Sequence, residues 1–455
     1  MQHGLHCGAG IAAFCNGWAN AMARETVQVI GTSTADPAAV WAIARDFCGL
    51  WHPAIATMAA IRDTQGRLIR AFTLKGEGAL YRERLTYFSD SDMTMAYSHV
   101  EGIAGVDSYN ARLTVMPDDK DGCVIRMSAV LTAPMLRAKE IANGTKGIFE
   151  DAVAALAFAA EQAAAQKPTP ARHAVSPADV TTETLYIDDL PKLAVEITPK
   201  KDGPLCLFLH GIGGSRLNWH RQLAVVGLTT RAAAMDLRGY GDSTLGAQQS
   251  MVDDYCDDIL RVAEVLGEQK IILVGLSYGA WIAASFAMRY PDRLLGLVLS
   301  GGCTGMSEAG ASERDAFRIS REVPLNAGQV PADFAPAVVK VLAGPDATDA
   351  VRAELLTSMA AIPASTYRDA LVCFTNPRER FDFAKMTMPV LMMTGEFDRL
   401  APPVEIRGVA ERIFDAAPSP DVRFEVIARA GHVCNVEGAD QYTSILQDFV
   451  AKVAP

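Results

Sequence analysis

The stretch that most constrains the fold of this chain is residues 271–281, IILVGLSYGAW. Four apolar residues, three of them β-branched, predict a buried strand, and the apolar positions that follow predict a helix. A strand that turns sharply into a helix lifts the hydroxyl of Ser277 out of the sheet. Gly275 and Gly279 flank the turn, because a side chain at either position would collide with the tight backbone. The five-residue pattern is weak by itself, so its context decides its meaning.

The length and charge of the chain limit what it can be. At 455 residues it is too long for one ordinary core, which predicts two or three domains. A net charge of −11 and the lack of basic runs argue against nucleic acid or an anionic membrane surface as a partner. No uncharged apolar run reaches the length of a membrane span; the nearest, residues 152–165, is interrupted by Glu161 and Gln162.

The nine cysteines are scattered, without C-x-x-C pairs or a His/Cys cluster of the zinc-binding type. This pattern predicts reduced thiols in a cytoplasmic protein, most of them small core residues. It predicts neither a disulfide framework nor a metal site.

The first residues require a separate interpretation. Residues 9–23 are moderately apolar and end in small residues, so a signal peptide has to be considered. No Lys or Arg precedes the apolar part, and Asn16 and Asn20 interrupt it, which favours a disordered extension over residues 1–24. We expect the chain to start at Met22, because domain-like sequence begins at once after it.

Residues 25–163 predict a first domain of the α+β type. Residues 26–32 alternate like a strand, and Asp36-Pro37 begins a short helix. Further strand-like runs, separated by turn signals, occupy residues 57–62, 67–74, 79–89, 94–99, 108–116 and 123–131. A long helix over residues 138–165 closes the segment. This order places the last helix across a curved sheet and leaves a cavity between the two.

This pattern resembles the START/Bet v 1-like (helix-grip) superfamily, close to its polyketide cyclase/dehydrase branch. The resemblance rests on the opening strand, the helix with Val40 and Trp41, the turn Leu50-Trp51-His52-Pro53 and the terminal helix. It implies that the domain binds a small apolar or aromatic molecule. His52 could do acid–base work, but a histidine beside a proline in a turn is more often structural.

Residues 164–180, with three prolines and little hydrophobic periodicity, predict a semi-rigid linker.

Residues 181–455 predict a second domain, in which the fully apolar run 205–209 indicates a central strand buried on both faces. Further strand-like runs alternate with helices, at residues 231–235, 271–274, 294–299, 390–393 and 423–427. Such alternation predicts a parallel sheet covered on both faces.

Five motifs occur in order along the second domain. They are His210-Gly211, Asp-x-Arg-Gly-x-Gly-x-Ser at residues 236–243, Gly-x-Ser-x-Gly around Ser277, Thr-Gly-Glu-Phe-Asp at residues 394–398, and Ala-Gly-His at residues 430–432. The domain therefore resembles the α/β-hydrolase fold, near its enol-lactonase, aryl-ester and C–C hydrolase branches. The expected fold class is an α/β hydrolase with a mostly parallel, doubly covered sheet and a helical lid, preceded by an α+β helix-grip domain.

Acyl transfer needs a nucleophile, a base that accepts its proton and an acid that orients the base. Ser277 is the only serine on a predicted strand-to-helix turn, since Ser285 lies inside a helix and Ser300 at a strand end. His432 lies in a loop, and Asp398 follows a buried strand at the C-terminal edge of the sheet. The order Ser277, Asp398, His432 is the one that this fold uses, which predicts these three as the catalytic residues.

Backbone groups near the serine complete the predicted site. The N–H groups of Ile212 and Tyr278 are expected to form an oxyanion hole. His210 is expected to hold the first of these loops by hydrogen bonds. Arg238 and Asp242 are expected to pin the turn after their strand, with a direct role in substrate binding as the alternative.

Residues 303–385 interrupt the core between its sixth and seventh strands and are helix-prone, which predicts a lid that carries specificity. Phe317, Met359 and Phe374 are candidates for an apolar ceiling over the substrate, with packing inside the lid as the alternative. Trp219 is a further candidate for substrate binding, again with simple packing as the alternative.

The leading hypothesis is a cytoplasmic, cofactor-free serine hydrolase that acts on a small, hydrophobic or aromatic-derived ester or lactone. A serine at position 277 disfavours the haloalkane dehalogenase and epoxide hydrolase branches, which the resemblance associates with aspartate there. Two alternatives stay open: cleavage of a C–C bond in a ring-fission product, and a non-catalytic ligand receptor or carrier. We expect small-molecule partners, including a second hydrophobic ligand in the first domain, and no metal, nucleic acid or membrane.

Overall fold

The computed structural model describes residues 21–64, 67–118, 122–164, 181–188, 190–378, 380–418 and 420–454. The chain divides into two compact units, Met1–Arg172 and His173–Pro455. Nearly all of the expected extension and linker lies outside the described residues. The first strand begins at Met22, so residues 22–24 belong to the sheet and not to the extension predicted over residues 1–24.

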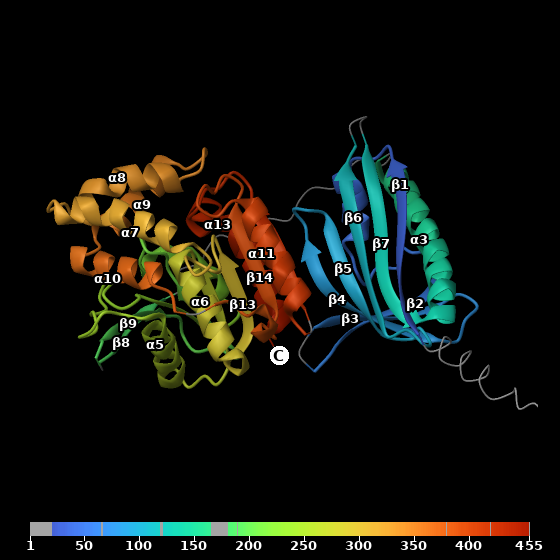
Figure 1. Ribbon diagram of the computed structural model, residues 1–455, viewed down its shortest axis with the longest axis horizontal. Coiled ribbons are helices and arrows are strands. Elements are labelled where there is room, and N and C mark those ends of the chain that lie inside the picture. Colours follow the sequence, from blue (N-terminus) through green and yellow to red (C-terminus); the bar gives the residue numbers. More distant parts are fainter. Residues whose placement is uncertain are drawn as a thin grey trace, which may run out of the picture. The chain divides into compact units, whose positions relative to one another are not determined.

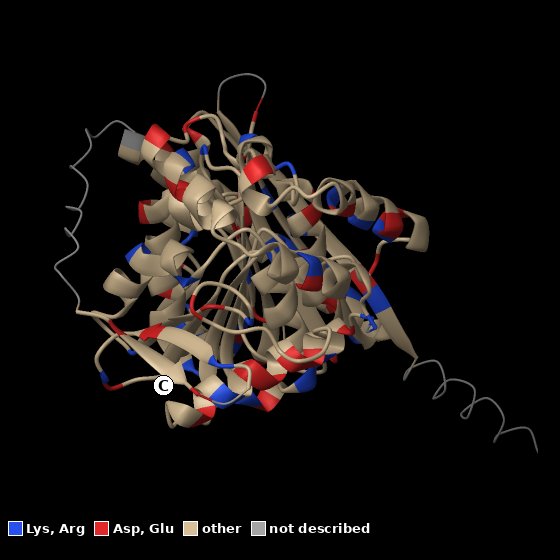
Figure 2. Ribbon diagram, turned by 90° about the vertical axis from the view of Figure 1, so that its left-hand side faces the viewer, with Lys and Arg blue, Asp and Glu red and all other residues tan. Residues whose placement is uncertain are grey.

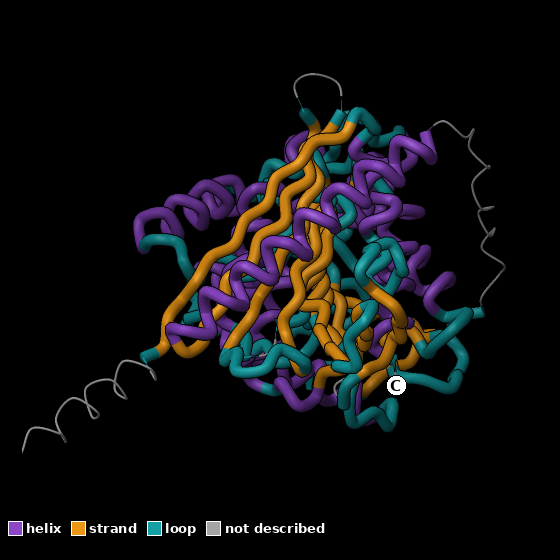
Figure 3. The backbone as a smooth tube through the Cα atoms, turned by 90° about the vertical axis from the view of Figure 1, so that its right-hand side faces the viewer, coloured by secondary structure: helices purple, strands orange, loops and turns teal. Residues whose placement is uncertain are grey.

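The N-terminal unit is an antiparallel sheet with a long helix across it. Its elements are β1 (Met22–Ser33), α2 (Pro37–Ala44), β2 (Ile55–Arg62), β3 (Leu68–Leu74), β4 (Leu80–Ser89), β5 (Thr94–Glu101), β6 (Ser108–Pro117), β7 (Cys123–Pro134) and α3 (Met135–Ala164). The strands lie in the order β1-β7-β6-β5-β4-β3-β2, each antiparallel to its neighbours. Figures 1 and 3 show α3 lying along β1 and β7.

The alternation of apolar residues decides which face of this sheet is buried. In β7 every second side chain from Cys123 to Ala133 is buried, as expected for a strand with one packed face. Apolar residues of α3 pack onto the same core. The helix approaches β1 so closely that a Cβ at Gly31 would lie 2.4 Å from Cγ1 of Val153. The α+β helix-grip fold predicted for this part of the chain is confirmed.

His52 of this unit has the surroundings of a structural histidine. Its Nδ1 accepts the N–H of Ala54 (3.1 Å), so Nε2 carries the proton and donates to the carbonyl oxygen of Ile148 at 3.0 Å. Burial lowers the pKa of His52, which keeps the imidazole neutral. Because both nitrogens are engaged, the side chain ties the turn after α2 to α3.

The C-terminal unit is a mostly parallel sheet between helices. Its core elements are β8 (Glu183–Ile187), β9 (Leu193–Ile197), β10 (Leu205–Leu209), η1 (Arg216–Trp219), α4 (His220–Val226), β11 (Ala232–Met235), α5 (Val252–Val265), β12 (Ile271–Leu276), α6 (Tyr278–Arg289), η2 (Pro291–Arg293), β13 (Leu294–Ser300), η3 (Phe383–Lys385), β14 (Val390–Gly395), α11 (Pro403–Ala416), β15 (Val422–Ile427), α12 (Cys434–Glu437) and α13 (Ala439–Val453). The strand order is β8-β9-β11-β10-β12-β13-β14-β15. All neighbours from β11 to β15 are parallel, whereas β8 and β9 run antiparallel to theirs.

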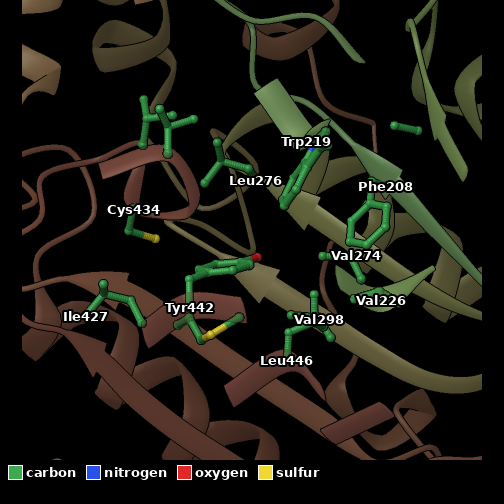
Figure 4. Packing of buried hydrophobic residues seen from close by; sticks show 14 of the residues in the cluster. Phe208, Trp219, Val226, Val274, Leu276, Val298, Ile427, Cys434, Tyr442 and Leu446 are labelled. Atoms are coloured by element: carbon green, nitrogen blue, oxygen red, sulfur yellow. The ribbon is translucent and has the colours of Figure 1, made fainter. Parts of the chain in front are cut away.

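Helices cover both faces of this sheet. α4 and α13 contribute to one core cluster, in which Phe208, Trp219 and Tyr442 are buried together (Figure 4). α5 and α6 lie outside that cluster, with α6 packed on β12 and β13. Each central strand is buried on both faces, which explains the continuous apolar run of β10. The predicted α/β-hydrolase architecture is confirmed.

Four helices are inserted between β13 and β14. They are α7 (Ala311–Asn326), α8 (Pro331–Leu342), α9 (Asp349–Ala360) and α10 (Ala364–Thr375). Figure 1 shows them gathered on one side of the C-terminal unit. We call these four helices the lid.

Candidate active site

Ser277 occupies the turn between β12 and α6. Its backbone has φ 55° and ψ −115°, a left-handed conformation that is rare for a residue with a side chain. Its N–H donates to the carbonyl oxygen of Ser300 at 2.7 Å. A Cβ at Gly275 would lie 2.3 Å from the carbonyl oxygen of Gly279, and a Cβ at Gly279 would lie 2.5 Å from that of Leu209. The glycines therefore make room for the turn that exposes the serine.

His432 lies beside Ser277 although the two are far apart in the sequence. Its Nε2 is 2.8 Å from Oγ of Ser277. The loop that carries it, between β15 and α12, is fixed because the N–H of His432 donates to the carbonyl oxygen of Leu342 at 2.8 Å. Only 5% of His432 is exposed. The imidazole is thus held against the serine by the end of lid helix α8.

Asp398 holds the other side of the imidazole. Nδ1 of His432 donates to the carboxylate, 2.8 Å from Oδ2 and 3.0 Å from Oδ1. Oδ1 also accepts the N–H groups of Leu400 (2.8 Å) and Ala401 (2.9 Å). The hydroxyl of Thr394 donates to the carbonyl oxygen of Ala401 at 2.7 Å and lies 3.2 Å from Oδ2. With the proton on Nδ1, Nε2 is the acceptor for the hydroxyl of Ser277. The structure therefore joins the three predicted residues in one hydrogen-bonded chain.

The two residues whose backbone N–H groups are expected to form an oxyanion hole, Ile212 and Tyr278, line the same cavity as Ser277. Tyr278 is the first residue of α6, where an N–H has no carbonyl partner within the helix. Ile212 lies in the loop after β10, and its carbonyl oxygen accepts the hydroxyl of Tyr240 at 3.1 Å. In the same loop a Cβ at Gly211 would lie 3.3 Å from Cβ of Ser277. The glycine thus lets this loop approach the serine closely.

His210 has the supporting place that the sequence predicts. Its Nε2 accepts the N–H of Leu237 at 3.1 Å, so Nδ1 carries the proton and donates to the carbonyl oxygen of Gly211 at 2.8 Å. Burial lowers the pKa of His210, against an opposing effect of Asp236. The neutral ring links the loop after β10 to the turn after β11.

Arg238 and Asp242 lie at that same turn. Nε of Arg238 donates to Asp258 at 2.9 Å, and Asp242 pairs with Arg216 at 2.7 Å. Neither residue lines the cavity in front of Ser277. Their contacts are those of residues that fix a turn.

A cavity of about 590 Å³ lies in front of the serine. Ser277, His432, Ile212 and Tyr278 line it together with residues of the lid. The three lid residues predicted as an apolar ceiling are all among them: Phe317, Met359 and Phe374.

Trp219 is not in this cavity, so its prediction as a substrate-binding residue is wrong. It is fully buried, with its ring centroid 5.0 Å from that of Phe208 and 6.0 Å from that of Tyr442 (Figure 4). Ser215 and Asn218 cap the short helix η1 reciprocally, which fixes its rotation. As a result Asn218 lines the cavity, and Trp219 faces the core.

Two other supporting residues were not predictable from the sequence. Oε2 of Glu437 accepts the N–H groups of Gly344 (2.6 Å) and Gly431 (3.0 Å), which ties the His432 loop to the chain after α8. Burial raises the pKa of Glu437. Thr394 stood in a motif, but nothing in that motif indicated that its hydroxyl contacts the carboxylate of Asp398. Such contacts join distant loops, and local periodicity carries no information about them.

Within the described ranges, no helix is long and apolar enough to cross a membrane. Nor do these ranges hold a group of three or more His, Cys, Asp or Glu side chains placed to bind a metal ion.

Comparison with known proteins agrees with this architecture. Residues 204–439, more than half of the chain, match the family described as alpha/beta hydrolase fold. The chain therefore belongs to the α/β-hydrolase fold family. Residues 24–161 match a second family, described as polyketide cyclase / dehydrase and lipid transport. The resemblances of both parts of the sequence are thereby confirmed.

Individual relatives are distant. Epoxide hydrolase B of Mycobacterium tuberculosis is 35% identical over 103 residues, which are 22% of this chain and only 29% of that enzyme. The Escherichia coli protein RutD is 25% identical over 270 residues, 58% of this chain and 97% of that protein. A thermophilic esterase from Thermogutta terrifontis superimposes with a TM-score of 0.52 at 23% identity, over 60% of this chain and 99% of the esterase. At that identity the likeness concerns the fold alone.

Proposed function

We propose that the C-terminal unit is a cofactor-free serine hydrolase that cleaves small, hydrophobic or aromatic-derived esters or lactones through an acyl-enzyme. The observation that carries this proposal is the chain from Ser277 Oγ to His432 (2.8 Å) and on to Asp398 (2.8 Å), which opens on a cavity. A nucleophile, a base and an orienting carboxylate in hydrogen-bond contact are what acyl transfer requires.

The reaction follows from the positions of these atoms. His432 Nε2 takes the proton of the Ser277 hydroxyl as Oγ attacks the carbonyl carbon of the substrate. The tetrahedral oxyanion is stabilised by the N–H groups of Ile212 and Tyr278. As the intermediate collapses, Nε2–H gives its proton to the leaving oxygen, and an acyl group stays on Oγ. Water, deprotonated by Nε2, then attacks the acyl carbon; the bond to Oγ breaks, and Nε2–H returns its proton to Oγ as the acid leaves. Asp398 stabilises the imidazolium in both halves.

The walls of the cavity support a small, largely apolar substrate. The rings of Phe317 and Phe374 lie 5.9 Å apart, and that of Phe374 lies 5.6 Å from Tyr278, beside the nucleophile. Met359 contributes a flexible thioether to the same cavity. A volume of about 590 Å³ lies within the usual range for small-molecule pockets, roughly 300–1,000 Å³, and leaves room for an aryl ester or a lactone.

Several relatives are named epoxide hydrolases, but a serine nucleophile is poorly suited to hydrolysing an epoxide. Attack of Oγ of Ser277 on an epoxide would form an ether, which has no carbonyl carbon that water could attack. The enzyme would stop after one turnover. An ester or lactone instead gives an acyl-enzyme that water can cleave. A C–C bond beside a carbonyl remains an alternative substrate for the same three residues.

A serine-to-alanine substitution tests the proposal. Ser277→Ala removes the nucleophile, so kcat for phenyl acetate should fall roughly 10⁴- to 10⁶-fold. Ser285→Ala is the matched control, because Ser285 lies buried inside α6, away from the hydrogen-bonded chain, and should keep wild-type turnover. Retained hydrolysis in folded Ser277→Ala protein would refute the assignment of the nucleophile. A panel of aryl esters, lactones and ring-fission products then separates ester from C–C cleavage.

We further propose that the N-terminal unit binds a hydrophobic small molecule related to the substrate or product. Its match to a family described by polyketide cyclisation and lipid transport supports this proposal. The net charge of −11 for the whole chain disfavours a polyanion as partner. On the C-terminal unit, which faces the viewer in Figure 2, acidic and basic residues are interspersed.

Covalent blocking of the hydrolase site tests this second proposal. After a fluorophosphonate has reacted with Ser277, 2-naphthol should still bind at one saturable site, quenching the fluorescence of Trp41 and Trp51 in the N-terminal unit. Loss of all saturable binding after the reaction would place the ligand in the hydrolase cavity and contradict the proposal.

A further inference from the structure

The charged residues that line the hydrolase cavity differ in whether they have an ion-pair partner. Glu308 is held by Arg412 in two hydrogen bonds of 2.9 and 2.5 Å. Glu313 and Glu405 are exposed to solvent. Arg321 of α7 is the one Lys or Arg among the described residues that line the cavity. Arg321 is thus the single Lys or Arg side chain of the described cavity lining, and Glu308 pairs with Arg412 instead of with it.

The contacts of Arg321 are with neutral groups. Its guanidinium carbon lies 3.4 Å from the ring centroid of Phe317. Nη1 donates to the carbonyl oxygen of Phe317 (3.0 Å) and to the hydroxyl of Ser320 (3.1 Å), and the side chain also bonds to Tyr367. In the part of the chain that the structure describes, no carboxylate lies within ion-pair distance of this guanidinium.

Half-burial of an uncompensated cation is unfavourable, and a bound anion would offset that cost. Burial lowers the pKa of Arg321, with an opposing effect of Tyr367, but a guanidinium stays protonated at neutral pH. The contacts above use only part of its five N–H donors, which form a planar fork suited to a carboxylate.

The position of Arg321 connects it to the nucleophile. Phe317, on which the guanidinium lies, has its ring centroid 5.9 Å from that of Phe374. Phe374 in turn lies 5.6 Å from Tyr278, the residue after Ser277. Ser277 and Arg321 line the same cavity as these rings, so one substrate bound there can contact both residues.

We propose that Arg321 binds a carboxylate of the substrate, so that the ester or lactone cleaved at Ser277 carries a negative charge away from the scissile bond. This inference rests on the proposed function and specifies its substrate class. Arg321 lines the same cavity as the exposed side chains of Glu313 and Glu405. A monoanion therefore fits better than a phosphate dianion, because it leaves less negative charge uncompensated.

Two esters with acyl chains of equal length test the proposal: monophenyl adipate, which carries a carboxylate, and phenyl hexanoate, which does not. The wild type should prefer the adipate. In Arg321→Gln the ratio of kcat/KM for adipate to that for hexanoate should fall about 10- to 100-fold. This is the factor expected when one charge-assisted hydrogen bond to the substrate is lost. Arg318→Gln on the same helix is the control: Arg318 pairs with Asp315 at 3.1 Å outside the cavity, so the ratio should stay unchanged. An unchanged ratio in Arg321→Gln would overturn the inference.

A binding measurement separates this inference from the proposed function. Ser277→Ala protein should bind monomethyl adipate more tightly than methyl hexanoate in isothermal titration, and the added Arg321→Gln substitution should abolish the difference. If the difference is present but no ester is hydrolysed, the proposed function is wrong and the anion site stands. If hydrolysis depends on Ser277 but binding shows no Arg321-dependent preference, the anion site is wrong.

Discussion

At the scale of single residues, the site depends on a serine held in an unfavourable backbone conformation. A non-glycine residue at φ 55° costs about 1–3 kcal/mol. The hydrogen bond from the N–H of Ser277 to Ser300 and the start of α6 oppose this cost. The conformation turns Oγ toward His432, away from the sheet. Strain at this residue thus serves the chemistry proposed for it.

The sequence could predict that Ser277, Asp398 and His432 come together, because each follows a strand whose C-terminal end lies at the same edge of a parallel sheet. It could not predict Thr394 or Glu437 as their supports. Those hydrogen bonds depend on how loops from different parts of the chain meet, and one sequence carries no pattern for that.

The buried His210 predicts a pH dependence of stability. Burial lowers its pKa in the folded state, so below the unfolded value of about 6.5 the unfolded chain binds a proton that the folded chain does not. Stability is therefore lost as pH falls below about 6.5, by at most about 1.4 kcal/mol per pH unit for this group. His210→Gln should lose less unfolding free energy between pH 7 and pH 5.5, measured by guanidinium titration.

His220→Gln provides the comparison, because it removes an exposed histidine of α4 and leaves the buried ring of His210 in place. Identical losses in His210→Gln and the wild type would contradict the role given to the buried ring.

At the scale of elements, a glycine at the turn from β12 to α6 and a glycine inside α11 should respond in opposite ways to substitution by alanine. Gly275→Ala should destabilise the C-terminal unit by about 1–3 kcal/mol or more, because its Cβ would lie 2.3 Å from a backbone oxygen that cannot move away. Gly408→Ala, inside α11 with nothing within 4 Å, should stabilise it by about 0.5–1 kcal/mol. Urea unfolding measures both. Equal stability of the two variants would show that packing around the turn is looser than these distances indicate.

The lid shows which elements the sequence predicts well. Its four helices were predictable because prolines and glycines separate apolar periodic segments, and Phe317, Met359 and Phe374 do line the cavity. Trp219 was wrongly predicted, because a four-residue helix such as η1 is too short for periodicity to show which way a side chain points. The reciprocal cap between Ser215 and Asn218 decides that direction.

At the scale of the whole molecule, the chain combines two units whose folds were both predictable from the change in pattern along the sequence. Single-faced alternation in strands such as β7 indicates an antiparallel sheet, and continuous apolar runs such as β10 indicate a parallel one. The dimensions of the hydrolase cavity and the place of Arg321 in it were not predictable. Both depend on the packing of the lid helices over the sheet, to which each helix contributes only a few residues.

Trapping of the acyl-enzyme tests the central claim most directly. Protein mixed with phenyl acetate and quenched in acid within the first turnover should gain the mass of one acetyl group, and peptide mapping should place it on Ser277. Two substitutions should greatly slow the formation of the acyl-enzyme. His432→Ala removes the base, and Asp398→Asn removes the carboxylate that orients it. Acetylation of another residue, or turnover of the ester without any acyl-enzyme at Ser277, would contradict the account.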